Sequence, residues 1–254
     1  MPRFYIPPPA WNTDRLVLDG PEAHHCLDVL RMQAGERAVV FNGRGAEATV
    51  EITAAQKERV ELKLLHRAKS PPLRCEITLG QAIPKGKNMD LIVEKATELG
   101  AAAIAPLLSD RTVVQVEPDD SARKQEKWQR VAIEAAKQCG QNWLPAVHAP
   151  RTPRAFFDSG PKFDLMLIAS LQSDARNLKQ VLAEIAWNSG PPRRGPNAPS
   201  VLVLVGPEGD FTPAEISLAR SHGCHPITLG PIILRTETAA IYCLSVLSHE
   251  LLSA

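Results

Sequence analysis

Two glycine-containing turns near residues 206 and 230 gather the side chains best suited to chemistry. The first is Gly206-Pro207-Glu208-Gly209, and the second, Gly230-Pro231, leads into Leu234-Arg235-Thr236-Glu237-Thr238. Glycines in a turn allow positive φ and let a ligand approach the backbone closely. An arginine can pair with a phosphate, and a carboxylate can accept a proton. The pattern favours a ligand site with charged groups on one side, although two ordinary strand-to-helix turns would look similar.

Each turn lies between an expected strand and an expected helix. Val201–Val205 is a continuous apolar run, typical of a strand buried on both faces of a parallel sheet. Thr212-Pro213-Ala214-Glu215 has the pattern of a capping box, so a helix is expected from there to His222. Ile227–Leu229 is a second short strand, and an apolar-periodic helix follows residue 234. Parallel strands end at one edge of an open sheet, where such sheets bind ligands.

The rest of the chain shows two patterns of secondary structure. Residues 1–70 are expected to form a small β-barrel with one short helix, because short strands (16–18, 38–41, 46–52 and 60–65) flank turn signals such as Asn42-Gly43. After the expected linker Ser70-Pro71-Pro72, strands alternate with helices, as in a parallel α/β sheet. The strands are 76–82, 103–107 and 163–169, and the helices are 88–99, 123–139, 153–158 and 177–187. Residues 188–200, rich in Pro and Gly, are expected to form an exposed loop.

Composition limits the class of protein. The chain has 254 residues, 44% hydrophobic content and a net charge of +1, so a nucleic-acid partner would have to be held by local basic patches. We expect a cytoplasmic protein with no membrane partner, because no signal-peptide pattern or membrane-length apolar run is present. Five scattered cysteines indicate reduced thiols. His222, Cys224 and His225 lack a second pair at ligand spacing, so no metal is expected.

The two turns also carry a family resemblance. GPEGDFTPAEI and LGPIILRTETA resemble the two signature segments of the ribosomal RNA small-subunit methyltransferase E family. Matching segments in the same order cover nearly the whole chain: Arg3-Phe4-Tyr5, His24-His25, Val29-Leu30-Arg31, Lys85–Gly100, Ser109-Asp110-Arg111 and Glu134–Gln138. The resemblance implies an enzyme that uses S-adenosylmethionine to methylate N3 of a uridine in small-subunit (16S) ribosomal RNA, free or in the assembled subunit.

The resemblance also implies a fold. It is α/β: a PUA-like β-barrel that binds RNA at residues 1–70, and a SPOUT-type parallel sheet with a C-terminal trefoil knot at residues 73–254. The family builds its active site beside a subunit interface, so a homodimer is implied as well. The knot comes from the resemblance alone, because periodicity does not reveal one.

Cofactor binding falls to the glycine turns, whose backbone groups can read the edge of an adenine. The expected pocket residues are Gly206, Pro207, Glu208, Gly209, Leu229, Gly230, Ile232, Leu234, Thr236, Thr238 and Ala239. Three of these, Leu229, Leu234 and Ala239, would equally suit plain core packing.

Arg235 and Glu237 are the expected catalytic residues. Arg235 would pair with a phosphate or stabilise the uridinate oxygen, while Glu237 would accept a proton or orient Arg235. A local ion pair at the helix start is the structural alternative. The identity of the general base stays open.

RNA contacts need exposed cations. The expected ones are Arg3, His25, Arg31, Lys85, Lys87 and Arg111, and Arg193-Arg194 lie in the long loop. Two positions depart from the family pattern: Gln141 and Ile232 stand where members usually or often carry arginine, which puts those two cationic contacts in doubt.

Two other functions remain open. A non-catalytic RNA-binding protein on the same scaffold would not need the intact turn at residues 234–239. An unrelated α/β enzyme would be stabilised thermally by NAD or ATP instead of S-adenosylmethionine.

Overall fold

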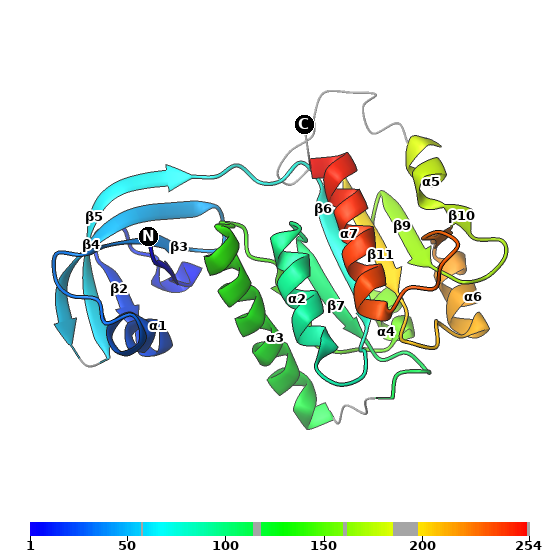
Figure 1. The fold of residues 1–254 in the computed structure, drawn as a ribbon, viewed down its shortest axis with the longest axis horizontal. Helices are drawn as coiled ribbons and strands as arrows, with labels where there is room; N and C mark the ends of the chain where they lie inside the picture. Colours follow the sequence, from blue (N-terminus) through cyan, green and yellow to red (C-terminus); the bar gives the residue numbers. More distant parts are fainter. Residues whose placement is uncertain (57, 114–117, 160–161, 185–197, 253–254) are drawn as a thin grey trace. The chain divides into compact units, whose positions relative to one another are not determined.

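The structure, a computed structural model, describes residues 1–56, 58–113, 118–159, 162–184 and 198–252 (Figure 1). These residues form two compact units: Met1–Pro72 with Ile133–Leu144, and Leu73–Ala132 with Pro145–Ala254. The expected loop at 188–200 lies outside the described residues except at 198–200, and Arg193-Arg194 lie outside them entirely. Among the described helices, none is long and apolar enough to cross a membrane.

The N-terminal unit contains a five-stranded sheet in the order β1-β3-β4-β5-β2. Its strands are β1 (Arg3–Tyr5), β2 (Leu16–Asp19), β3 (Arg37–Phe41), β4 (Ala46–Gln56) and β5 (Arg59–Lys69). β1 pairs with β3 in parallel, whereas the other neighbours are antiparallel. The four strands expected from the sequence are confirmed. β1 was missed, because three residues followed by a run of prolines give almost no strand signal.

The one short helix expected in the N-terminal region, whose pattern covers residues 22–30, is divided in two. α1 (Gly20–His24) is followed by a π-helical turn, η2 (His25–Val29), and a 3-10 turn, η1, covers Pro8–Ala10. The core of the unit is formed by alternating strand residues, which include Leu16, Leu18, Val50 and Ile52, and by Phe4 of β1. Alternation buries one face of each strand, as the sequence pattern predicted.

The second unit is built on a seven-stranded sheet in the order β10-β12-β9-β11-β6-β7-β8. Every neighbouring pair is parallel, so the expectation of a parallel α/β sheet is confirmed. The strands are β6 (Glu76–Ala82), β7 (Ala103–Leu107), β8 (Ala146–Val147), β9 (Leu165–Ala169), β10 (Arg176–Asn177), β11 (Ser200–Val205) and β12 (His225–Thr228). β8 and β10 were missed, because two residues carry no periodicity.

Helices cover both faces of this sheet. The helices of this unit are α2 (Asn88–Glu98), α4 (Pro153–Ser159), α5 (Leu178–Glu184), α6 (Pro213–Ser221) and α7 (Thr236–Leu252). A further helix, α3 (Pro118–Cys139), is divided between the two units, because its residues from Ile133 onward belong to the N-terminal unit. α2 and α7 lie side by side over the sheet (Figure 1). α4 and α6 pack together in a core that includes Leu202 and Leu204 of β11. Since successive side chains of a strand point to opposite faces, Val203 and Val205 lie on the other face of β11.

The start of α6 follows from its sequence. The Thr212 hydroxyl accepts a hydrogen bond from the Glu215 backbone N, 3.3 Å, and the Glu215 carboxylate accepts one from the Thr212 backbone N, 2.8 Å. The expected capping box is therefore confirmed. It fixes the first turn of α6 just beyond the Gly206–Gly209 turn.

Candidate functional site

A pocket opens at the carboxyl edge of the parallel sheet, where the adjacent strands β9, β11 and β12 end. It contains about 560 Å³ of empty space, a volume that includes space open to solvent. The loops after the three strands line it, and the start of α7 closes one side. The two glycine turns thus meet at one pocket, as the parallel arrangement predicts.

Nine of the eleven residues expected to bind a cofactor line this pocket. They are Gly206, Pro207, Glu208, Leu229, Gly230, Ile232, Leu234, Thr236 and Ala239. Gly209 and Thr238 do not belong to the lining, and neither do the expected catalytic residues Arg235 and Glu237. Sequence reasoning missed the remaining lining residues: Ala169, Ser170, Leu171, Val205, Asp210, Thr228 and Ile233. A signal existed for the first three, because Ala169 ends an expected strand of the same sheet and Ser170 and Leu171 follow it.

The expected conformation of the first turn was wrong. Neither Gly206 nor Gly209 has a positive φ; within this turn Asp210 takes it instead, at +60°. A Cβ on Gly206 would lie 3.0 Å from the backbone N of Phe211. Glycine is therefore favoured here because the turn folds back on itself and leaves little room for a side chain. In the second turn, Gly230 does have a positive φ of +120°, with open space around it.

Two carboxylates of the first turn hold neighbouring loops. The Glu208 carboxylate accepts a hydrogen bond from the Lys85 backbone N, 2.9 Å, in the loop between β6 and α2. The Asp210 carboxylate accepts one from the Leu171 backbone N, 3.1 Å, in the loop after β9. The turn is thereby tied on both sides to loops that also end strands of the sheet.

A third loop is tied to the same region through a buried carboxylate. Glu215 is 7% exposed and accepts hydrogen bonds from the Ser109 hydroxyl, 3.1 Å, and the Asp110 backbone N, 2.9 Å. The Arg111 guanidinium donates to the Gly209 carbonyl oxygen. The segment Ser109-Asp110-Arg111 is thus held against the first glycine turn, with Arg111 exposed beside it.

Arg235 and Glu237 lie at the start of α7. Arg235 is exposed and Glu237 is half-buried in the first helical turn. Within the described part of the chain, neither side chain forms an ion pair or hydrogen bond, so the alternative of a local Arg–Glu pair is not found. Both residues flank Thr236, which does line the pocket. They are therefore next to the pocket in sequence without belonging to its lining.

The cations expected to contact RNA have different surroundings. Lys85 and Lys87 are exposed in the loop that Glu208 holds, and Arg111 is exposed beside Gly209. In the N-terminal unit, Arg31 is exposed with a φ of +55°. Arg3 differs, because its side chain is 15% exposed and already paired.

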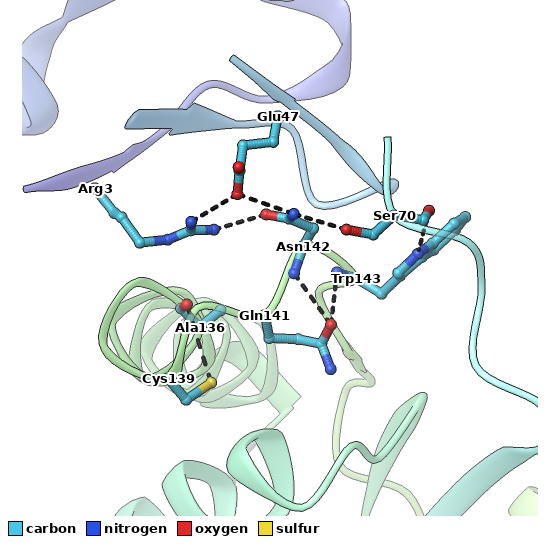
Figure 2. Close-up of polar contacts among 8 residues, drawn as sticks. All are labelled: Arg3, Glu47, Ser70, Ala136, Cys139, Gln141, Asn142 and Trp143. Carbon is cyan, nitrogen blue, oxygen red and sulfur yellow. Dashed lines mark hydrogen bonds and ion pairs between the residues drawn. The ribbon is translucent and has the colours of Figure 1, made fainter. Parts of the chain in front are cut away.

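Arg3 belongs to a polar cluster of the N-terminal unit, shown in Figure 2. Its guanidinium donates to the Glu47 carboxylate, 2.7 Å, and to the Asn142 amide oxygen, 2.6 Å. Asn142 donates in turn to Glu47, 3.0 Å, and to the Ser70 hydroxyl, 2.9 Å. Burial would raise the pKa of Glu47, but the hydrogen bonds and charge of Arg3 and the Asn142 amide lower it below its ordinary value of 4.5.

Gln141, one of the two departures from the family pattern, has a local role. Its amide oxygen accepts hydrogen bonds from the backbone N of Asn142, 3.1 Å, and of Trp143, 3.2 Å (Figure 2). Arginine has no acceptor atom and could not make these two contacts. Gln141 therefore shapes the turn after α3 that presents Asn142 to the polar cluster.

His25 contacts a buried lysine. The Nζ of Lys137, a residue 8% exposed, lies 3.1 Å from His25 Nδ1 and 3.2 Å from the Glu22 carboxylate. Burial raises the pKa of Glu22, and the lysine charge opposes that rise. Lys137 is part of the N-terminal unit, where it neutralises Glu22, and its contact occupies one ring nitrogen of His25.

The described residues contain no group of three or more His, Cys, Asp or Glu side chains that could hold a metal ion. His222 has other contacts: its ring stacks on Phe157, with centroids 4.6 Å apart.

Comparison with known proteins identifies the class. A family model described as "RNA methyltransferase domain" matches residues 71–248, and one described as "RNA methyltransferase PUA domain" matches residues 18–65. The chain is an RNA methyltransferase. It is 31% identical to the ribosomal RNA small subunit methyltransferase E of Bacillus subtilis, over 92% of this chain and 89% of that protein. The chain belongs to the ribosomal RNA small subunit methyltransferase E family.

Two solved structures are similar over nearly the whole chain. A putative methyltransferase from Legionella pneumophila, solved with bound S-adenosylmethionine, matches with a TM-score of 0.84, 34% identity and coverage of 98% of this chain and 97% of that one. The ribosomal RNA small subunit methyltransferase E from Neisseria gonorrhoeae, also bound to S-adenosylmethionine, matches with a TM-score of 0.80, 32% identity and 98% coverage of both chains.

Proposed function

We propose that this protein uses S-adenosylmethionine to methylate N3 of a uridine in small-subunit (16S) ribosomal RNA. The pocket at the ends of β9, β11 and β12 carries this proposal, because it brings both glycine turns together. Family membership supplies the reaction class, and the two relatives solved with S-adenosylmethionine support the choice of cofactor.

The lining of the pocket has the chemical character that a nucleoside with an amino-acid tail requires. Its walls combine apolar side chains, such as Leu229 and Leu234, with the backbone of Gly206 and Gly230. Apolar walls suit an adenine ring, and backbone groups can read its edge. When bound, S-adenosylmethionine supplies a methyl group on a positively charged sulfur. The nine lining residues named above are the proposed contacts, and Gly209 and Thr238 would act by shaping the turns that carry them.

The proposed chemistry on the RNA side rests on Arg235 and Glu237. Deprotonation of uridine N3 places negative charge on the adjacent carbonyl oxygens, and the exposed guanidinium of Arg235 would stabilise it. Glu237, two residues further along, is the proposed proton acceptor. Both side chains are unpaired within the described residues, so neither has to leave a partner to meet the substrate.

RNA binding would use cations near the pocket. Lys85, Lys87 and Arg111 are exposed, and the first glycine turn holds both of their loops. Arg31 of the N-terminal unit is a further proposed contact. Arg3 and His25 are proposed to act indirectly, since Glu47 and Asn142 occupy Arg3 and Lys137 occupies one ring nitrogen of His25.

The finer features of the architecture are part of the proposal. We infer that the second unit carries the C-terminal trefoil knot of SPOUT enzymes, that the N-terminal unit is a PUA-like barrel, and that the protein acts as a cytoplasmic homodimer. The match of residues 18–65 to a PUA domain model supports the inference about the N-terminal unit, and the others rest on the family resemblance. Sedimentation at micromolar concentration tests the oligomeric state: a monomer would contradict the dimer.

Isothermal calorimetry with S-adenosylmethionine and its demethylated product tests the cofactor. No binding at millimolar ligand would contradict the proposal. Mass-spectrometric mapping of ribosomal RNA from cells that lack the protein tests the substrate, because one uridine of the small-subunit RNA should lose its methyl group. If the protein were a non-catalytic RNA-binding protein, RNA from cells that lack it would still carry every methyl group.

A further inference from the structure

A glutamine beneath the pocket is buried among the apolar residues of β6. Gln81 is 0% exposed and lies opposite Val205 of β11 in the sheet register. It is not one of the residues that line the pocket. A fully buried amide in a strand is costly unless its polar atoms are paired, so its contacts indicate why it is there.

Gln81 begins a chain of hydrogen bonds across three elements. Its Nε2 donates to the Ala82 carbonyl oxygen, 2.8 Å, and to the Thr236 hydroxyl, 3.2 Å. The Thr236 hydroxyl donates to the Gly206 carbonyl oxygen, 2.5 Å. The chain therefore links the end of β6 with the start of α7 and the first glycine turn.

The hydrogen-bond partners fix the direction of this chain. A carbonyl oxygen only accepts, so the amide atom that faces Ala82 must be the nitrogen. The Thr236 hydroxyl has a single proton, which it donates to the Gly206 carbonyl oxygen, so it must accept the hydrogen bond from Gln81. Gln81 thereby holds Thr236 in the rotamer that reaches Gly206.

The amide oxygen on the other side has no partner. Gln81 Oε1 is one of two buried side-chain atoms in the described residues without a hydrogen-bond partner. An orphaned buried acceptor destabilises a fold. An apolar side chain of similar length would avoid this penalty, so the fold alone does not account for glutamine at this position.

We propose that Gln81 is a positioning residue for the cofactor pocket: it acts through Thr236 to hold the Gly206 carbonyl and the start of α7. Thr236 and Gly206 both line the pocket and come from the two turns that form it. The link fixes the distance between those turns before a ligand arrives, which lowers the ordering cost of binding. This inference rests on the proposed use of S-adenosylmethionine.

The test compares variants of similar shape in the full-length protein. Gln81→Met removes the amide, and Thr236→Val removes the hydroxyl. Matched controls are Gln125→Met, which loses a 3.0 Å hydrogen bond to the Val147 carbonyl, and Thr97→Val, which loses a buried 2.8 Å bond to the Val93 carbonyl. Neither control residue lines the pocket.

Calorimetry should give a Kd for S-adenosylmethionine about fivefold higher in Gln81→Met, since one neutral hydrogen bond contributes roughly that factor. The double variant with Thr236→Val should bind no more weakly than Thr236→Val alone, because Gln81 acts through that hydroxyl. KM for S-adenosylmethionine should rise with Kd while KM for RNA stays constant. The melting temperature of Gln81→Met should fall by no more than that of Gln125→Met.

Unchanged affinity in Gln81→Met, or losses that add in the double variant, would overturn the proposal. Gln81→Leu provides a second variant if methionine does not pack. Failure of both to fold would show that the fold itself requires the amide, and this too would overturn it. If the wild-type protein does not bind S-adenosylmethionine, the proposed function fails instead.

Discussion

At the residue scale, the polar side chains of the two turns divide into those that build the site and those that face a ligand. The carboxylates of Glu208 and Asp210 accept hydrogen bonds from the backbone N of Lys85 and of Leu171, respectively. The side chains of Arg235 and Glu237 form no hydrogen bond or ion pair within the described residues. This division makes the latter pair the better candidates for chemistry, since a catalytic charge must remain available to the substrate.

Arg235→Ala should lower kcat for RNA methylation by about 100-fold, because removal of one charge-stabilising donor has roughly that effect. The Kd for S-adenosylmethionine should stay within about twofold, since Arg235 does not line the pocket. Single-turnover methylation assays and calorimetry measure the two quantities. Arg220→Ala, on α6 and paired with Asp174, is the matched control, and equal losses in both variants would argue against the assignment.

At the element scale, Glu215 connects the cap of α6 to the loop after β7. Its carboxylate accepts hydrogen bonds from the Thr212 backbone N, the Ser109 hydroxyl and the Asp110 backbone N. The capping box was visible in the sequence, but its contact with residues about 105 positions away was not. One side chain therefore serves as a local cap and as a long-range tie.

Glu215→Ala should lower the free energy of unfolding by about 3 kcal/mol, because it removes a cap and leaves buried donors unpaired. Urea denaturation measures this loss. Glu215→Gln keeps one acceptor oxygen and should lose about half as much, while exposed Glu250→Ala should be nearly neutral. A loss below about 0.5 kcal/mol in Glu215→Ala would contradict the role of the tie.

Glu47 gives the N-terminal unit a specific pH dependence. Its pKa is lower in the folded protein than its ordinary value of 4.5, so the carboxylate stabilises the fold above that pH. This contribution is lost as the pH falls through the lowered pKa. The stability advantage of the wild-type protein over Glu47→Gln should therefore be fully present at neutral pH and should shrink as the pH falls below 4.5 and through the lowered pKa of Glu47. Urea unfolding followed by circular dichroism at several pH values checks this, and an advantage that is constant with pH would count against it.

At the scale of the whole molecule, the N-terminal unit is discontinuous in sequence. It includes Ile133–Leu144, the end of α3 and the turn after it. This segment supplies Lys137, which neutralises the half-buried Glu22, and Asn142, which bridges Glu47 and Ser70. The domain boundaries expected from the sequence, 1–70 and 73–254, assign this segment to the second domain, and they remain a prediction.

A fragment of residues 1–72 alone should be much less stable than the same unit in the full chain. It lacks the segment Ile133–Leu144 of the same compact unit, and it leaves the half-buried Glu22 without the lysine that neutralises it. Heteronuclear NMR spectra of the fragment should show poor dispersion. In the full-length protein, Lys137→Met should destabilise more than Lys124→Met, a change at a lysine on the same helix for which no ion pair is found within the described residues. A well-folded fragment would contradict this account.

The sequence by itself determined the elements and the main features of the site. Continuous apolar runs, a capping box and glycine turns are local signals, and they located β6, β7, β11 and α6 as well as nine pocket-lining residues. The carboxyl ends of parallel strands lie at one edge of the sheet. The two turns, about 24 residues apart in sequence, both follow such strands and could therefore be expected to meet.

Only the tertiary structure decided which polar side chains form hydrogen bonds or ion pairs within the protein. Arg3 appeared to be a surface cation in the sequence, and Gln81 an ordinary position in a strand. Their partners, Asn142 and Thr236, lie 139 and 155 positions away. Side-chain pairing at such separations depends on how the elements pack, and periodicity within an element carries no information about it.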